Sequence, residues 1–242
     1  GVYKAREIDI PGHNLKNIFP AMDFLTASNK KGLGDKVELF DKGILNAEGK
    51  DVVVIGGGDT AMDCVRTSIR QKAKSVKCLY RRDRENMPGS AREVGNAIEE
   101  GVEFVWLTSP KSFIGNTKVE AVEVNKMRLG EPDSSGRRRP EIQIGAEYKI
   151  QADLVIKSLG FDPENIPKLF NAEELAISKW GTIKIDLKTM QTSAYAYAGV
   201  SVSNLQLALP VVCLCSTSPP GRSLDDCNQA NWDEVVKASL GW

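Results

Sequence analysis

Three consecutive glycines, Gly56, Gly57 and Gly58, stand between an apolar run and a helix-like segment. Strand, glycine turn and helix, in that order, form the setting in which such glycines bind the diphosphate of a dinucleotide. In the pattern G-x-G-x-x-A, Gly56 permits the tight turn and Gly58 lets a diphosphate approach the backbone. Ala61 lets the helix pack closely on its strand. The chemistry predicted for this stretch is therefore cofactor binding.

The residues after the glycines open the predicted helix, residues 60–72. The N–H groups at the helix start have no partner within the helix and carry a partial positive charge that favours phosphate, so Asp59 and Thr60 are candidate cofactor contacts together with the glycines and Ala61. We expect the Asp59 carboxylate to cap the helix rather than to take part in catalysis. Apolar residues that would face a sheet recur at helical spacing: Met62, Val65 and Ile69.

A pair of arginines follows the second predicted strand, residues 75–80. Sites selective for NAD place an acidic residue about 20 positions beyond the glycines, where it accepts from the ribose 2′-hydroxyl. This chain has Arg81 and Arg82 there. Two guanidiniums can clamp a 2′-phosphate through paired donors, which favours NADPH over NADH. The alternative is a solvated charged loop.

Gly160 ends the last apolar strand of the predicted sheet, residues 153–159. Ligands of open α/β sheets bind beyond the carboxyl ends of parallel strands, which makes Gly160 a candidate cofactor contact. A simple turn glycine is an equally good interpretation.

The elements that must position these residues form a βαβαβ run with short connections. Helix 91–100 and strand 102–107 complete it, and residues 119–129 and 141–150 predict a hairpin with a long loop. The sequence thus predicts an α/β fold. Before the glycines, residues 17–26 predict a short helix with one apolar face, and residues 29–46 a polar linker. That face would hold Ile18, Met22 and Leu25.

Composition excludes several classes of function. The 242 residues carry equal numbers of basic and acidic groups, which argues against a nucleic-acid partner, and Arg137–Arg139 is interpreted as a solvated loop tip. One histidine and five irregularly spaced cysteines predict neither a histidine-based catalytic site, nor a metal site, nor a disulfide framework. No apolar run approaches the roughly 20 residues of a membrane span. We expect a cytoplasmic protein without membrane contact.

Three motifs, GGGDTAMDC, YRRDRENMPGS and the strand end LGF-x-P, carry a specific resemblance. Over residues 1–193 the chain resembles the small (beta) subunits of bacterial NADPH-dependent glutamate synthases. More distant relatives are the reductase half of dihydropyrimidine dehydrogenase and ferredoxin-linked flavoproteins. The resemblance implies a Rossmann-like NADPH-binding domain, residues 49–163, inserted in a partial, FAD-domain-like second domain, residues 1–48 and 164–193.

In such proteins NADPH passes a hydride to FAD, and iron–sulfur clusters carry the electrons to the large subunit of glutamate synthase. Glutamate is then made from glutamine and 2-oxoglutarate. The hydride step needs apposed rings and excluded water rather than a side-chain acid, so no catalytic residue is assigned. The alternatives are a module that binds NADPH without FAD or catalysis of its own, and the reductase half of a related ferredoxin- or pyrimidine-linked flavoprotein.

Two departures from the family bear on FAD. The family's cluster-binding cysteines and first FAD fingerprint are missing from this sequence. Residues 194–242 are atypical: they lack the family's glycine–aspartate motif that touches FAD, and we interpret them as a frameshifted or chimeric coding end. Cys213, Cys215 and Cys227 fall short of a four-cysteine cluster set. We therefore expect this chain to bind NADPH and not to retain the FAD of the full-length protein.

Overall fold

The computed structural model describes residues 4–132, 138–193, 198–199 and 210–211. The chain divides into two compact units, residues 3–162 and residues 163–242 with residues 1–2. The strands are β1 (Lys4–Ala5), β2 (Ile18–Pro20), β3 (Asp51–Ile55), β4 (Ser75–Tyr80), β5 (Glu103–Trp106), β6 (Thr108–Ile114), β7 (Ala121–Pro132), β8 (Arg138–Gln151), β9 (Leu154–Lys157), β10 (Phe161–Asp162), β11 (Ala198–Gly199) and β12 (Pro210–Val211). The helices are α1 (Ala21–Gly32), α2 (Glu38–Asp41), α3 (Asp59–Arg70), α4 (Ala91–Glu99) and α5 (Ile166–Leu169).

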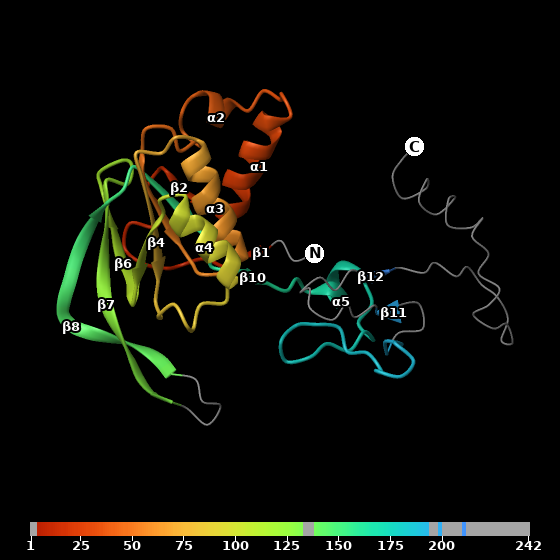
Figure 1. Ribbon diagram of the computed structural model, residues 1–242. Coiled ribbons are helices and arrows are strands. Elements are labelled where there is room, and N and C mark those ends of the chain that lie inside the picture. Colours follow the sequence, from red (N-terminus) through yellow and green to blue (C-terminus); the bar gives the residue numbers. More distant parts are fainter. Residues whose placement is uncertain (1–3, 133–137, 194–197, 200–209, 212–242) are drawn as a thin grey trace, which may run out of the picture. The chain divides into compact units, whose positions relative to one another are not determined.

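A five-stranded parallel sheet organises the first unit (Figure 1). Its strand order is β2-β9-β3-β4-β5, and every neighbouring pair is parallel. Ile55 at the end of β3 is level with Leu79 of β4 and with Lys157 of β9. Three adjacent strands therefore end together at one edge of the sheet. The predicted α/β fold is confirmed, and strand β4 has the predicted bounds.

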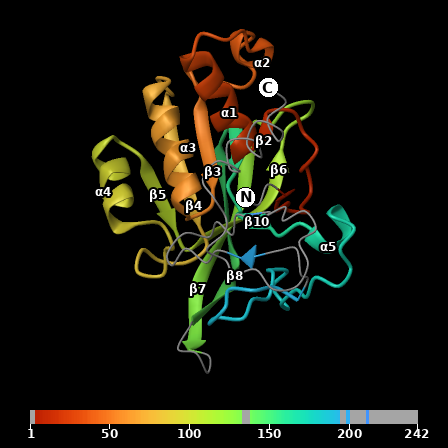
Figure 2. The ribbon, with the colours of Figure 1, turned by 90° about the vertical axis from the view of Figure 1, so that its right-hand side faces the viewer.

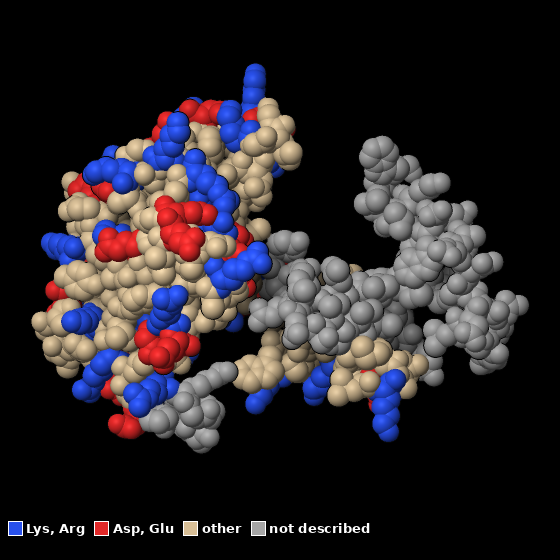
Figure 3. All heavy atoms as spheres, in the orientation of Figure 1, with Lys and Arg blue, Asp and Glu red and all other residues tan. Residues whose placement is uncertain are grey.

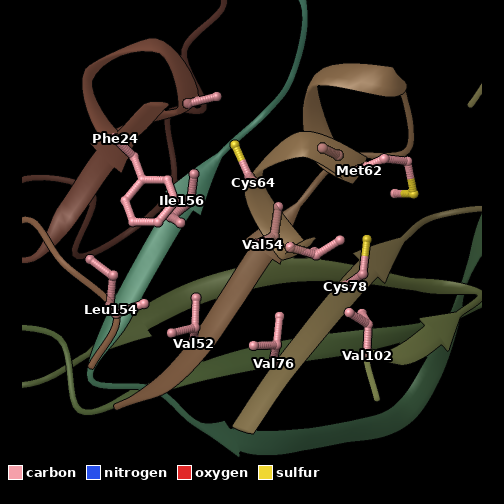
Figure 4. Packing of buried hydrophobic residues seen from close by; sticks show 14 of the residues in the cluster. Phe24, Val52, Val54, Met62, Cys64, Val76, Cys78, Val102, Leu154 and Ile156 are labelled. Atoms are coloured by element: carbon pink, nitrogen blue, oxygen red, sulfur yellow. The ribbon is translucent and has the colours of Figure 1, made fainter. Parts of the chain in front are cut away.

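Helices α1, α3 and α4 cover one face of this sheet (Figure 1). Alternate residues of the strands point toward them, and Figure 4 shows Val52, Val54 and Val76 on the side of the sheet where Phe24, Met62 and Cys64 of the helices lie. The predicted stripe on α3 is confirmed, since Met62 and Val65 are buried and Ile69 packs against the same cluster.

The opposite face carries a three-stranded antiparallel sheet with the order β6-β7-β8 (Figure 2). Val53 and Ile55 of β3 are buried in a second core cluster with Val122 and Val124 of β7. The central strands are covered on both faces, which explains why β3 is continuously apolar rather than alternating.

The segment before the glycines differs from its prediction. Residues 18–20 form strand β2 rather than the start of a helix, because Pro20 has an extended backbone and α1 begins only after it. The buried residues of α1 are Ala21, Phe24 and Ala27. Of the predicted face, Leu25 packs against the same cluster, whereas Met22 is exposed. The predicted linker contains the end of α1 and all of α2, and Leu45 is buried in the core.

The hairpin was predicted correctly as strands β7 and β8, but strand β6 beside it was missed. β6 has the sequence TSPKSFI, whose Pro110 and Lys111 interrupt any apolar alternation. Arg138 and Arg139 are exposed at the start of β8, whereas Arg137 lies outside the described residues.

The second unit is small in its described part. Helix α5 is capped by Asn165, whose side chain accepts from the Lys168 N–H at 3.2 Å. Behind it, Ala172 and Leu175 are buried. Beyond α5, strand pairing in the described residues up to 193 consists of two isolated antiparallel bridges, Ile177–Ile183 and Ile185–Thr192.

Of residues 194–242, the structure describes only the pair β11 and β12, which are antiparallel. Cys213, Cys215 and Cys227 lie outside the described residues. The division into a partial FAD-type domain, residues 1–48 and 164–193, and an inserted domain, residues 49–163, stays a prediction.

The surface charge and the helices are the features that bear on nucleic-acid or membrane binding. On the face in Figure 3, basic and acidic side chains are interspersed over the described residues. Among those residues, no helix combines the length and the apolar character needed to cross a bilayer.

The burial of Phe24 predicts that α1 is integral to the nucleotide-type sheet. Its side chain is 0% exposed among residues of α3 and β9 in one cluster. Phe24→Ala should lower the free energy of unfolding by about 3–5 kcal/mol, because it leaves a cavity. Leu33→Ala, at a position 85% exposed, is the matched control and should change it by less than about 0.5 kcal/mol. Urea denaturation measures both, and equal small effects would place α1 outside the core.

Candidate functional site

The glycine turn after β3 has room for side chains at only one of its three positions. Gly56 has φ 146°, and a Cβ built there would lie 2.1 Å from the Ser158 carbonyl oxygen. A Cβ at Gly57 would lie 2.4 Å from the Tyr80 ring. At Gly58 nothing lies within 4 Å, so the backbone is open at the position where the sequence predicts a diphosphate. The first two glycines are therefore required by packing, and the third leaves space.

Helix α3 begins directly at this opening. Gly58 is its N-cap, without a side-chain cap, and the Gly58 carbonyl accepts from the Ala61 N–H at 2.9 Å and from the Met62 N–H at 3.2 Å. The N–H groups of Asp59 and Thr60 lie before the first bond of the helix and have no partner within it. Ala61 is fully buried, as expected for the residue that brings the helix close to the sheet. Thr60 is half-buried beside it.

The prediction that Asp59 caps α3 is wrong. Asp59 is the first residue of the helix, and its Oδ1 accepts from the Ser90 N–H at 2.9 Å. Ser90 is in turn the N-cap of α4, where its hydroxyl accepts from the Glu93 N–H at 3.3 Å. Asp59 thus ties the starts of two helices together.

The two arginines follow β4, the strand next to β3. Arg81 is exposed. Arg82 is half-buried, and its carbonyl accepts from the Leu107 N–H at 3.0 Å. The Arg82 Nε is buried without a hydrogen-bond partner among the described residues. An orphaned donor of this kind costs about 1–3 kcal/mol, so this side chain retains unused hydrogen-bonding capacity.

Gly160 lies beyond β9, on the other side of the glycine turn. Its φ of 84° is in the left-handed region, and its carbonyl accepts from the Arg6 N–H at 3.0 Å. With Thr60 and Ser158 it lines a hollow of about 10 Å³. That volume admits about one water, so a larger ligand would have to lie over the edge.

The predicted site residues therefore come from three adjacent strand ends. Gly160 follows β9, the glycine turn follows β3, and the arginines follow β4. The chain continues from β3 to β4 and β5 on one side, and β9 and β2 lie on the other. This reversal at β3 and β9 is where open α/β sheets bind ligands.

Two hydrogen bonds that the sequence did not predict hold residues 81–90 against this edge, and Asp83 makes further bonds within the segment. The Gly89 N–H donates to the Gly57 carbonyl at 2.8 Å, and the Tyr80 hydroxyl donates to the Asn86 carbonyl at 2.8 Å. Asp83 Oδ1 accepts from both the backbone and the side chain of Asn86. The Asp-x-x-Asn spacing and the Pro-Gly turn were the available signals for this folded loop.

Within the described residues, no group of three or more His, Cys, Asp or Glu side chains is placed to hold a metal. Cys64 and Cys78 are buried free thiols. Burial raises the pKa of Cys64 far above its usual range and that of Cys78 to about 12. The Cys78 thiol also donates to the Gly56 carbonyl at 3.3 Å. Both are packing groups rather than reactive ones.

Sheet order, glycine turn and helix start together define an α/β protein whose open parallel sheet carries a glycine turn and a helix start at the carboxyl ends of its strands. The chain belongs to the pyridine nucleotide-disulphide oxidoreductase family, which it matches over residues 3–208.

Within this family, the chain is similar to individual curated proteins over most of its length. The chain is 58% identical over 193 residues to the glutamate synthase [NADPH] small chain of Azospirillum brasilense, and 60% identical over 193 residues to a putative glutamate synthase [NADPH] small chain of Cereibacter sphaeroides. Each match covers 80% of this chain but only 40% and 46% of the relatives, so the chain spans less than half of their length.

Among solved structures, FprA of Mycobacterium tuberculosis in complex with NADPH is similar in fold. Its TM-score is 0.57 at 19% identity, covering 69% of this chain and 50% of that one.

Burial of the two thiols provides a test of the packing around the glycine turn. At pH 8, iodoacetamide should leave Cys64 and Cys78 unmodified in the native chain, because their raised pKa values keep both thiols neutral and burial blocks access. Both should be labelled in urea. Peptide mapping by mass spectrometry separates them from the remaining cysteines, and native labelling of Cys78 would contradict the packing around Gly56.

Proposed function

We propose that this chain is the NADPH-binding portion of an oxidoreductase of the glutamate synthase small-subunit type. The observation that carries the proposal is the open space over Gly58 at the start of α3, one strand away from Arg81 and Arg82. An anionic ligand placed there would meet the N–H groups of Asp59 and Thr60, and Arg81 and Arg82 follow the neighbouring strand β4.

The diphosphate would lie over Gly58 and the first turn of α3. The N–H groups of Asp59 and Thr60 are at the helix start, where the helix dipole favours an anion. Gly58 supports this assignment because no atom fills the space that a side chain would occupy. Gly160 would border the same ligand from the β9 side.

The 2′-phosphate would be bound by Arg81 and Arg82. Charge-assisted bonds to phosphate are the strong class of hydrogen bond, and a guanidinium presents two parallel donors to it. Rotation of the Arg82 side chain toward a phosphate oxygen would also recover the hydrogen bond that its Nε lacks. A ribose 2′-hydroxyl offers these arginines no charge, so NADH would bind more weakly.

In the full-length protein, NADPH supplies a hydride, which FAD accepts. In that protein, the residues of this chain would bind and orient the dinucleotide. Both relatives are named as small chains of an NADPH-dependent glutamate synthase and are more than twice as long as the matched stretch. We therefore assign FAD, the iron–sulfur clusters and the contact with the large subunit to the full-length cytoplasmic protein, which would make glutamate from glutamine and 2-oxoglutarate.

The second candidate, a module that binds NADPH without FAD, describes the isolated chain. Purified chain should be colourless, without the visible absorption bands of a flavin, and should still bind NADPH. Absorption spectroscopy and a fluorescence titration with NADPH measure these two properties. A flavin spectrum that NADPH bleaches would instead show that residues 1–48 and 164–193 suffice to hold FAD.

The assignment of the 2′-phosphate is tested by Arg81→Ala. Removing one charge-assisted contact should weaken NADPH binding by about 1.5–3 kcal/mol and leave NADH binding nearly unchanged. Arg81 is exposed, so the fold should tolerate the change. Titrations of cofactor fluorescence measure both affinities.

Arg139→Ala is the matched control, since Arg139 is an exposed arginine at the start of β8. It should leave both affinities unchanged. Equal losses for NADPH and NADH in Arg81→Ala would refute the 2′-phosphate assignment.

A further inference from the structure

Residues 81–90, named here the arginine loop, are fastened to the glycine turn at two points. The Gly89 N–H donates to the Gly57 carbonyl at 2.8 Å. The Ser90 N–H donates to Asp59 Oδ1 at 2.9 Å. A Cβ at Gly89 would lie 3.0 Å from the Gly57 oxygen, so the two backbones are in close contact. The loop that carries the arginines and the turn that faces the diphosphate position therefore form one packed structure.

Tyr80 fixes the other end of the arginine loop. Its ring lies against Gly57, and its hydroxyl donates to the Asn86 carbonyl at 2.8 Å. The ring also meets Trp106 edge to face, with centroids 6.5 Å apart. Tyr80 directly precedes Arg81, so the direction in which the chain leaves β4 depends on this ring.

The end of the loop at Ser90 is anchored through α4. Arg66 of α3 pairs with Glu93 and with Glu100, and these side chains are only 21–28% exposed. Glu93 is in the first turn of α4, next to the Ser90 cap. Helix α4 is therefore held to α3, and Ser90 is held within reach of Asp59.

We propose that Asp59 and Tyr80 form a clasp that positions the arginine loop and thereby sets the preference for a 2′-phosphorylated dinucleotide. This proposal rests on the proposed NADPH site. Neither side chain has to touch the cofactor. Both act through the loop, by holding the arginines at a fixed reach from the diphosphate position.

The charge of Asp59 supports a role through the loop rather than through the ligand. A carboxylate at the first residue of α3 repels a nearby diphosphate and cannot donate to it. Its oxygen does satisfy the Ser90 N–H. Asp59→Asn keeps an acceptor oxygen and removes the charge, whereas Asp59→Ala removes both, so the two variants separate the clasp from simple electrostatics.

The test compares the dissociation constants for NADPH and NADH of the full chain and of Asp59→Ala, Asp59→Asn and Tyr80→Phe. Asp59→Ala and Tyr80→Phe should each reduce the preference for NADPH about five- to tenfold, the value of one hydrogen bond, mostly by weakening NADPH binding. Asp59→Asn should keep the preference. Asp63→Ala, an exposed acidic residue one turn further along α3, is the matched control and should leave the preference unchanged.

Hydrogen exchange of the cofactor-free chain supplies an independent readout. The clasp predicts faster exchange in peptides containing Gly89 and Ser90 for Asp59→Ala and Tyr80→Phe, with the exchange of α3 unchanged. Unchanged exchange in both variants would overturn the clasp. So would equal losses of NADPH and NADH affinity, or an unaltered preference.

The clasp and the site fail in different ways. If the unaltered chain shows no preference for NADPH, the proposed cofactor assignment falls, and the clasp's role in selectivity falls with it. If the unaltered chain prefers NADPH, and Asp59→Ala and Tyr80→Phe show the same preference as the unaltered chain, only the clasp is wrong.

Discussion

The site depends on two places where the chain has no room for a side chain. At Gly56 and Gly57, a methyl group would overlap the Ser158 carbonyl and the Tyr80 ring, respectively. These contacts press the end of β3 against β9 on one side and against β4 on the other. After these two close contacts the chain enters α3, and Gly58 faces open space. Glycine is needed at the first two positions for packing, whereas at the third nothing lies within 4 Å of the place that a Cβ would occupy.

Burial on both faces of the sheet turns this local constraint into a fixed edge. Residues of β3 alternate between the helix-covered cluster and the cluster shared with β7. Slippage or tilting of the strand would therefore disrupt the packing on both faces. A one-residue slip would exchange the two faces. Because β9 and β4 are held in register with β3, Gly160 and Arg81 also keep their places at that edge.

The sequence was most informative where one pattern dominated. The run VVVI, the glycines and the stripe of α3 determined β3, the turn and the helix, and β4 was predicted with its bounds. Prediction failed where tertiary packing chose between alternatives. Pro20 separates a three-residue strand from α1, and only the pairing of β2 with β9 makes that strand visible. Strand β6 exists because β7 pairs with it, although its own residues lack alternation.

At the candidate site, the sequence predicted where the residues lie in the sheet better than it predicted their hydrogen-bond partners. The glycines, the arginines and Gly160 lie at one edge of the sheet, as expected for residues that follow neighbouring parallel strands, and their contact with a cofactor stays a proposal. The partner of Asp59 was not found, because capping is the ordinary role of aspartate near a helix start and its actual partner, Ser90, is 31 residues away. Such a contact depends on how α4 docks on α3 through Arg66, and helix docking of that kind has no local signature. The contacts of the proposed clasp, which join Asp59 to Ser90 and Tyr80 to Asn86, are therefore visible only in the three-dimensional structure, even though each of these residues lies inside a sequence motif.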